Sequence, residues 1–378
     1  MKDYPLATNT LGDEEREAIL RVFDSGRITA GQEVAAFERE FAHHVGSRHA
    51  VMVNSGSSAN LLMIATLVEE GRLKAGDEVI VPAVSWATSY YPLHQYGLKI
   101  VLCDVDPYTF NLTRAHVEEC ITKHTRAVLA VNLLGNPCNY DHLQMLCATK
   151  GLILLEDNCE GFDARWGTKH CGTFGEMGTF SSYFSHHLNT MEGGMIVTDN
   201  VYQAQLMRSL RSHGWMRGWP NCDPKGFEFN YIGYNVRPME MAAAIGRVQL
   251  RHYVRAGVSG RRAANALRFQ TLFGQDPRWY PQRPEGSQPS WFGLGLVLSP
   301  DMNLELARET LNVAGIETRP IIAGNFARQP VAKKMNITHG PLPGADLLHD
   351  HGLMLGNDER DLRGWIDTAF GLLREVAA

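Results

Sequence analysis

The chain has 378 residues, of which 44% are hydrophobic and 20% are charged, a composition typical of a globular protein with one large and one smaller domain. Its net charge of −5 disfavours a partner bound through many phosphates, so we expect no nucleic-acid partner, although a local pocket for one nucleotide is compatible with that charge. No run approaches the ~20 apolar residues of a membrane span and the N-terminus lacks an apolar signal stretch, so we expect a cytoplasmic protein with no membrane partner.

Apolar runs alternate with helical patterns along the first two thirds of the chain, which is typical of a mostly parallel sheet covered by crossover helices. The predicted helices there are 14–23, 32–45, 58–73 and 239–255, and the predicted strands are 49–53, 78–81, 98–105, 126–133, 152–156, 178–184 and 194–198. Beyond them, helices are predicted over 261–273, 304–314 and 359–376, a strand over 291–298 and a loop over 281–289. We therefore predict a large α/β domain over residues 1–255 and a smaller C-terminal α+β domain over 256–378.

The most informative run covers residues 180–194 and reads Phe-Ser-Ser-Tyr-Phe-Ser-His-His-Leu-Asn-Thr-Met-Glu-Gly-Gly. It resembles the cofactor-lysine segment of the sugar aminotransferases (the DegT/DnrJ/EryC1/StrS family), in which a lysine stands six residues before the Glu of a Glu-Gly-Gly. In this chain His186 holds that position, and no lysine lies between Lys169 and Lys225. A histidine has no amine with which to hold the cofactor aldehyde as an internal Schiff base, so the resemblance implies the cofactor without its covalent anchor.

A candidate phosphate site lies where a predicted strand turns into a predicted helix, at Ser55, Gly56 and Ser57. The unpaired N–H groups and the dipole of a helix N-terminus favour an anion. From these residues alone, an ordinary helix capped by Ser57 explains the pattern equally well. In the sugar aminotransferases the same turn grips the cofactor phosphate, and Ser181 matches a hydroxyl that also touches it, although a serine on a strand needs no such role.

Three further residues match positions that hold the cofactor ring in the family. Asp157 follows a buried strand, at the edge where open α/β sheets bind ligands, and would pair with the ring nitrogen. By itself it could equally be a solvated carboxylate at a loop. Trp86 matches the aromatic residue that stacks on the ring, and core packing is its alternative. Glu160 stands where the family usually has a glutamine against the ring hydroxyl, a departure that matches the dehydratase branch.

Four further residues are candidates for contacts with the neighbouring subunit or with the nucleotide sugar. Asn235 matches an asparagine that reaches the phosphate of the neighbouring subunit, so the resemblance implies a homodimer with shared active sites. Arg237 could hold a carboxylate, and His213 and Arg319 lie in segments that could contact the nucleotide sugar. No motif in these segments discriminates GDP from CDP or dTDP.

The seven cysteines are scattered, with no Cys-x-x-Cys pair, and read as free thiols. We therefore expect no bound metal. An iron-dependent relative would hold an iron–sulfur cluster through cysteines after the histidine, and this chain has only Cys222 beyond Cys171. No iron–sulfur reductase partner is expected.

The resemblance covers essentially the whole chain and includes four further segments, residues 132–137, 172–175, 213–215 and 318–321. It implies a pyridoxal-phosphate protein of fold type I, with an aspartate aminotransferase-like large domain and a smaller C-terminal α+β domain. The implied activity is that of a lyase: a 3-dehydratase that uses pyridoxal 5′-phosphate and pyridoxamine 5′-phosphate. It would remove the C3 hydroxyl of a nucleotide-linked 4-keto-6-deoxyhexose, with GDP-4-keto-6-deoxy-D-mannose the expected substrate.

In that reaction L-glutamate would supply the amino group, ammonia would be released, and the product would enter colitose and O-antigen lipopolysaccharide biosynthesis. His186 is the expected base, since a neutral imidazole can take a proton at physiological pH. Its neighbour His187 is the alternative if both lie on a strand, where adjacent side chains face opposite ways. Three other functions stay open: a nucleotide-sugar aminotransferase, a 3-dehydrase acting on a CDP- or dTDP-sugar, and a non-catalytic protein with a cofactor fold.

Overall fold

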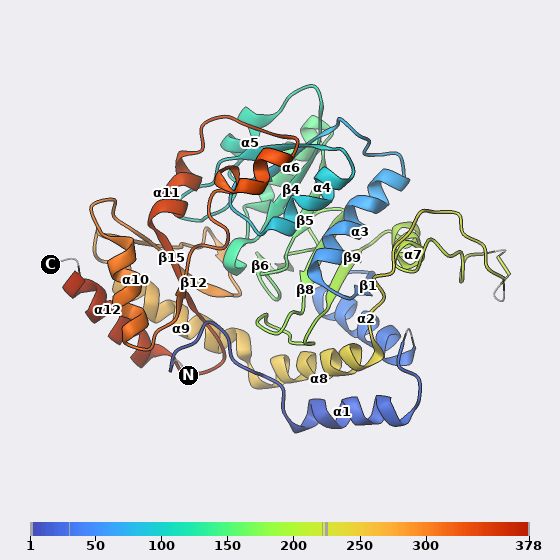
Figure 1. Cartoon of the computed structure of the whole chain (residues 1–378), viewed down its shortest axis with the longest axis horizontal. Coiled ribbons are helices and arrows are strands. Elements are labelled where there is room, and N and C mark those ends of the chain that lie inside the picture. The colour runs from blue at the N-terminus through green and yellow to red at the C-terminus, as the bar shows by residue number, and fades with distance from the viewer. Residues whose placement is uncertain (1–2, 30, 221, 224–225, 377–378) are drawn as a thin grey trace.

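The computed structural model describes residues 3–29, 31–220, 222–223 and 226–376 (Figure 1). Its largest sheet has eight strands in the order β1-β9-β8-β5-β4-β2-β3-β14. These are β1 (His49–Val53), β2 (Glu78–Pro82), β3 (Lys99–Cys103), β4 (Thr125–Val131), β5 (Ile153–Asp157), β8 (Met177–Ser181), β9 (Gly194–Thr198) and β14 (Ile337–His339). Only β9 runs against its neighbours, so the predicted mostly parallel sheet is confirmed.

Helices cover both faces of this sheet, because successive residues of a strand point to opposite faces and both sets are apolar here. In β1, Val51 and Val53 belong to the core beneath α3 (Gly56–Glu69) and α7 (Val201–Leu210). Ala50 and Met52 pack instead with α2 (Gln32–Val45) and α8 (Glu240–Ala256). α1 (Asp13–Asp24) lies outside α8, and Figure 1 shows the two side by side. The remaining helices packed on this sheet are α4 (Tyr91–Gln95), α5 (Arg114–Cys120) and α6 (Tyr140–Lys150).

A second, antiparallel sheet has the order β10-β12-β15-β13 and packs against its own core with three helices. Its elements are β10 (Trp279–Pro281), β12 (Gly293–Leu298), β13 (Thr318–Arg319), β15 (Gly352–Gly356), α9 (Val258–Phe273), α10 (Leu304–Val313) and α12 (Arg363–Val376). β14 and α11 (Pro343–His351) follow β13, yet β14 pairs parallel with β3 in the large sheet. The large sheet is therefore completed by a strand from beyond residue 256, and the domain boundary at that residue stays a prediction.

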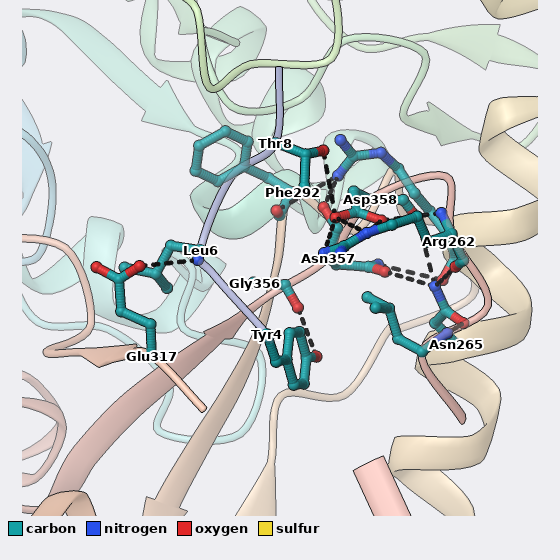
Figure 2. A network of polar contacts seen from close by, with 12 residues as sticks. Tyr4, Leu6, Thr8, Arg262, Asn265, Phe292, Glu317, Gly356, Asn357 and Asp358 are labelled. Atoms are coloured by element: carbon teal, nitrogen blue, oxygen red, sulfur yellow. Dashed lines mark hydrogen bonds and ion pairs between the residues drawn. The ribbon is translucent and has the colours of Figure 1, made fainter. Parts of the chain in front are cut away.

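The N-terminal segment packs against the antiparallel sheet before α1 begins (Figure 2). The Tyr4 ring is fully buried, and its hydroxyl donates to the carbonyl of Gly356 over 2.8 Å. The backbone N–H of Leu6 donates to a Glu317 carboxylate oxygen over 3.1 Å. These contacts tie the start of the chain to the C-terminal region, more than 300 residues away.

Several elements differ from those that the sequence predicts. The strand predicted over 178–184 ends at Ser181, so the two histidines lie in the turn after it. The loop predicted over 281–289 holds a short strand, β11 (Ser287–Gln288), which pairs with β6 (Arg165–Trp166) beside β7 (Lys169–His170). The helices α4 to α7 and α11 were not predicted. Asn139 and Asn200 cap α6 and α7 through side-chain oxygens that accept backbone N–H groups, a sequence signal that could have located both. No helix among the described residues is long and apolar enough to cross a membrane.

Candidate active site

The strand-to-helix turn of the predicted phosphate site lies against the end of β8. Ser55 is the N-cap of α3 and its Oγ accepts the N–H of Ser58 over 3.1 Å, so the cap is Ser55 and not Ser57. A Cβ built on Gly56 would lie 2.7 Å from the Cβ of Ser181, so a side chain there would clash. The N–H groups of Gly56 and Ser57, at the first helical positions, have no acceptor within the helix and can receive an anion. Ser55, Gly56, Ser57 and Ser181 are thus brought together.

Asp157 ends β5 and its side chain is held by three donors. One carboxylate oxygen accepts from Asn60 Nδ2 over 2.8 Å and from Ser89 Oγ over 2.7 Å, and the other accepts from the N–H of Cys159 over 3.2 Å. The residue is 5% exposed, so it is not a solvated carboxylate at a loop. Its position is fixed before any ligand arrives, which is the condition for an electrostatic partner that reorganises little.

The residues that hold Asp157 escaped the sequence analysis. Asn60 is fully buried on α3, where its Oδ1 also accepts the hydroxyl of Thr179 over 2.6 Å. The Oγ atoms of Ser89 and Ser85 lie 2.7 Å apart. An asparagine inside the apolar helix that follows Ser55–Ser57 was the available signal, because a buried amide needs a partner.

Trp86 lies at the edge of the same cluster. It precedes the short 3₁₀ helix Ala87–Ser89, and its carbonyl accepts the N–H of Ser89 over 3.0 Å. Its side chain is among the exposed large hydrophobics, at 59%. Core packing therefore does not explain this tryptophan, and its ring is free to take a planar ligand on one face.

Glu160 lies three residues beyond Asp157 and accepts the N–H of Leu134 over 2.8 Å. Burial among protein atoms, reinforced by the charge of Asp157 and opposed by the Leu134 hydrogen bond, raises the pKa of Glu160 to about 8. At neutral pH this carboxyl group is therefore protonated and can donate a hydrogen bond, as the family's usual glutamine amide would.

A short strip of backbone connects Glu160 to His186. The carbonyl of Leu134 accepts the N–H of Phe292 over 2.9 Å, and the ring centroids of Phe292 and His186 lie 4.9 Å apart. Leu134 and Trp291 both adopt left-handed backbone conformations, with φ of 54°, which non-glycine residues avoid. Strain of this kind persists where the surrounding structure imposes it, and it gathers at functional sites.

His186 and His187 differ in what they contact. His187 is 5% exposed, and its Nε2 lies 3.1 Å from the carbonyl oxygen of Ser290. The Nδ1 of His186 is buried without a hydrogen-bond partner. Because β8 ends at Ser181, the condition that both histidines lie on a strand is not met, and the alternation of side chains along a strand cannot separate them. The contacts separate them instead: the Nδ1 of His187 is also buried without a partner, but its Nε2 is engaged with the backbone, whereas no hydrogen bond among the described residues engages the His186 ring.

A buried cation lies behind the two histidines. Arg262 is 6% exposed, and its Nη1 donates to the carbonyls of Asn357 over 2.6 Å and Trp291 over 3.2 Å (Figure 2). Burial first, and then the charge of Arg262, lower the pKa of His186 to about 4. From the sequence an imidazole of ordinary basicity is expected. In the folded chain His186 is held neutral at neutral pH, so its ring nitrogen is available to take a proton, but as a weaker base than an ordinary imidazole.

The candidates for contacts with the neighbouring subunit or the nucleotide sugar do not join the Asp157 cluster through any contact among the described residues. Arg237 Nη1 lies 2.9 Å from His213 Nε2, and Asn235 is exposed beside a backbone bridge to Ser212. These three residues, His213, Asn235 and Arg237, belong to the segment between α7 and α8, which projects from the body of the chain (Figure 1). Arg319, on β13, has a side chain that is 69% exposed, and its Nη2 lies 3.9 Å from a Glu317 carboxylate oxygen.

An anion-binding helix start, a buried carboxylate at the C-terminal edge of a mostly parallel sheet and an exposed tryptophan beside it define an aminotransferase-like α/β protein. The chain belongs to the DegT/DnrJ/EryC1/StrS aminotransferase family, whose sequence profile matches residues 9–359.

Two curated relatives are named GDP-4-keto-6-deoxy-D-mannose 3-dehydratase. The protein from Yersinia pseudotuberculosis is 43% identical, over 99% of both chains. The protein from Escherichia coli O55:H7 is 44% identical, over 100% of both chains. A solved structure of GDP-4-keto-6-deoxymannose-3-dehydratase with a trapped PLP-glutamate geminal diamine superposes with a TM-score of 0.93, at 43% identity, over 98% of this chain and 100% of that one.

Proposed function

We propose that the protein is a pyridoxal-phosphate-dependent lyase that removes the C3 hydroxyl of GDP-4-keto-6-deoxy-D-mannose. L-glutamate supplies the amino group that the cofactor carries, and ammonia is released. The observation that carries the proposal is His186, a neutral base with a free ring nitrogen where an aminotransferase has its lysine. The relatives that match the whole chain at 43–44% identity bear the name of this activity, and they support the choice of sugar and nucleotide.

The residues at the sheet edge fit a bound pyridoxamine phosphate. The turn at Ser55–Ser57 and the hydroxyl of Ser181 would hold the phosphate, Asp157 the ring nitrogen, and Trp86 one face of the ring. Glu160, protonated at neutral pH, would donate to the ring oxygen. When bound, this cofactor would supply an amine that condenses with the C4 ketone and a ring that holds the electron pair released by deprotonation until the C3 hydroxyl leaves.

The proton transfers are assigned to His186. Its neutral imidazole would take a proton from the C4′ carbon of the cofactor and deliver it to the departing C3 hydroxyl. Burial, and after it the charge of Arg262, keeps the ring from holding a proton at rest, so His186 begins the cycle in its basic form. Since the chain has no lysine at this position to reclaim the cofactor, the nitrogen leaves as ammonia and is not kept on the sugar.

We also infer a homodimer with shared active sites. Asn235 is exposed where the projecting segment returns to the body, since the carbonyl of the next residue, Val236, accepts the N–H of Asn54 over 3.1 Å, and the segment exposes Phe227 by 79% and Ile232 by 89%. Exposed apolar side chains on a projecting arm are typical of a surface covered by a partner. In the dimer Asn235 would reach the partner's phosphate site, and His213, Arg237 and Arg319 would contact the nucleotide sugar. Because both proposed substrates are cytoplasmic metabolites, we place the enzyme in the cytoplasm.

The proposal is tested by incubating the protein with pyridoxal phosphate, L-glutamate and GDP-4-keto-6-deoxy-D-mannose. We expect ammonia and 2-oxoglutarate in equal amounts, together with a 3-deoxy sugar. The CDP- and dTDP-linked 4-keto sugars serve as controls for the nucleotide and should react more slowly. A 4-amino sugar formed without ammonia would establish an aminotransferase. Binding of pyridoxamine phosphate is monitored by its absorbance, and failure to bind would indicate a non-catalytic protein.

A further inference from the structure

A second cluster of titratable side chains lies outside the active site. His44 comes from the last turn of α2, Asp163 from the loop after β5 and His170 from β7. One ligand atom from each of the three lies within 4.8 Å of the others. The side chains are 18%, 14% and 7% exposed, in that order, so the cluster is mostly buried but reaches solvent at His44.

The contacts within this cluster are incomplete. His44 Nε2 and His170 Nδ1 both face the same Asp163 oxygen, at 3.5 Å and 3.6 Å. Both nitrogens are buried and neither has a hydrogen-bond partner. Buried polar atoms in folded proteins are nearly always paired, so two orphaned ring nitrogens aimed at one carboxylate call for something between them.

The separations match the edges of a metal coordination shell. With zinc–nitrogen and zinc–oxygen bonds of 2.0–2.2 Å, neighbouring ligands of a tetrahedral zinc lie ~3.3–3.5 Å apart. The separations of 3.5 Å and 3.6 Å lie at and just above the upper end of this range, and both are long for hydrogen bonds. Asp163 has a left-handed backbone conformation, with φ of 65°, at the turn that presents its carboxylate to the two rings. For a non-glycine residue this conformation costs energy, and bound metal would offset it.

We propose that His44, Asp163 and His170 bind a divalent transition-metal ion of the zinc class, with water completing the coordination on the solvent side. Imidazole and carboxylate ligands suit zinc, cobalt and nickel, whereas magnesium and calcium prefer oxygen ligands alone. This site is distinct from the proposed cofactor site. It also departs from the sequence expectation of no metal, because more than a hundred residues separate His44 from its two partners and no spacing motif marks them.

The charges around the cluster are mixed. Neutral imidazole rings offer lone pairs to a metal ion, and the Asp163 carboxylate beside them supplies a negative charge. Arg165 Nη2 lies 3.7 Å from the same Asp163 oxygen and is 35% exposed. This guanidinium competes with a metal ion for the carboxylate and sets a limit on the affinity.

A bound ion would join α2 to the β6–β7 hairpin and fix the loop that follows Glu160. Phe162, next to Asp163, stacks on the His44 ring with centroids 5.3 Å apart and planes at 15°. It also lies 6.4 Å from the ring of His187. The ion would therefore support the apolar layer on which the histidine turn rests, and we expect it to stabilise the fold without taking part in the reaction.

The test is zinc binding by the full chain after chelator treatment, measured by titration against a chromophoric chelator. We expect one zinc ion per chain, with the affinity reduced at least ~100-fold in His44→Gln and His170→Gln, since even loss of an outer-shell partner costs 10–100-fold. The matched control is His43→Gln, which changes the exposed neighbour of His44 on the same helix and should bind as the wild type does. Equal affinity in the wild type and the two ligand variants would overturn the proposal.

Two further measurements keep the test decisive if a ligand variant folds poorly. Arg165→Gln removes the competing guanidinium and should bind zinc more tightly than the wild type; unchanged or weaker binding contradicts the site. Cobalt substitution reports the ligand type, since the free cysteines of the chain would give thiolate charge-transfer bands. Their presence would locate the metal elsewhere, and their absence is expected. Zinc should also raise the Tm of the wild type and of His43→Gln but not that of His170→Gln.

Discussion

Asp157 and His186 belong to one proposed active site but are held in opposite ways. The Asp157 carboxylate accepts three hydrogen bonds, from Asn60, Ser89 and Cys159. The His186 ring packs near Phe292, and its Nδ1 has no partner. A group that must stay charged and in place through a reaction needs donors that do not move. A group that must gain and lose a proton is hindered by a permanent hydrogen bond, so the contrast indicates a fixed electrostatic partner and a mobile proton carrier.

The same contrast separates His186 from its neighbour. His187 lies 3.1 Å from the Ser290 carbonyl and is more deeply buried, whereas no hydrogen bond among the described residues engages the His186 ring; the Nδ1 atoms of both are unpartnered. We therefore assign the proton transfers to His186 and to His187 the role of holding the segment that carries Trp291 and Phe292. Each prediction that follows removes one side of this comparison.

The largest effect is expected for His186→Asn, which keeps the size and polarity of the side chain but removes its basicity. Dehydration should fall by about 10²–10⁴-fold, the usual contribution of a positioned acid or base. Binding of pyridoxamine phosphate should persist, because the residues that would hold it are untouched. Steady-state rates of ammonia release and absorbance titrations measure the two effects separately.

His187→Asn is the control for this change. It should lower the Tm, because a buried contact to Ser290 is lost, while the dehydration rate stays within about tenfold of the wild type. If His187→Asn abolished dehydration and His186→Asn did not, the assignment of the two histidines would be reversed.

The lowered pKa of His186 predicts how stability depends on pH. From its ordinary value of 6.5, the pKa falls to about 4 in the folded chain, so between these values the unfolded state binds more protons. Stability should therefore be full above pH ~6.5 and decline as the pH falls toward ~4, with a contribution of up to about 3 kcal/mol from this ring. Urea unfolding across this range should show a shallower acid loss in His186→Asn. An identical pH dependence in the two proteins would mean that His186 is not held neutral.

On the fixed side of the comparison, Asp157→Asn should weaken binding of pyridoxal phosphate by about 10²-fold, because a neutral amide cannot pair with a charged ring nitrogen. Asn60→Ala keeps the carboxylate but removes one of its donors, and should cost less, about 0.5–1.5 kcal/mol of the same binding energy against the ~2.7 kcal/mol of a 10²-fold loss. Absorbance titration with the cofactor checks both. A larger effect from Asn60→Ala than from Asp157→Asn would show that the amide itself, and not the carboxylate, is the main ligand.

Glu160 lies between the two types of group, since it is hydrogen-bonded yet titratable near the working pH. With its pKa at about 8, it loses its donor proton as the pH rises, and kcat/KM should fall above that pH. Glu160→Gln keeps a donor at every pH. The fall in kcat/KM of about tenfold per pH unit that the wild type should show above its Glu160 pKa is therefore expected to be absent in this variant. The pH profiles of kcat/KM for the two proteins give the comparison. An unchanged alkaline limb would assign it to another group.

The sequence was sufficient for the frame of this site because short, local signals mark its parts. A buried apolar run predicts β5 and so places Asp157 at the sheet edge, and Ser55–Ser57 marks the start of α3. The spacing to Glu192 selects His186. In each case the position depends on a strand or helix whose apolar pattern is visible in one stretch of chain.

What the sequence could not supply depends on contacts between distant segments. Arg262 lies some 75 residues from His186, and its effect on the histidine pKa requires the fold to bury both. Leu134 joins Glu160 to Phe292, since its N–H donates to the Glu160 carboxyl group and its carbonyl accepts the N–H of Phe292, and no residue pattern encodes these bonds. The end of β8 at Ser181 was missed because the aromatic residues after it have high strand propensity, which the turn overrides.

The smallest effect is expected for substitution of Trp86, whose exposed side chain is neither hydrogen-bonded like Asp157 nor packed like His186. Its ring is 59% exposed, so Trp86→Ala should leave the Tm within about 1 °C while weakening binding of pyridoxamine phosphate by about 0.5–1.5 kcal/mol, the value of an aromatic stack. Trp86→Phe should recover most of that loss, because a smaller ring still stacks. Absorbance titration and thermal melts of the three proteins give both quantities. If Trp86→Ala lowered the Tm and left cofactor binding unchanged, the ring would be packing against protein, and the planar-ligand role would belong to another side chain at the sheet edge.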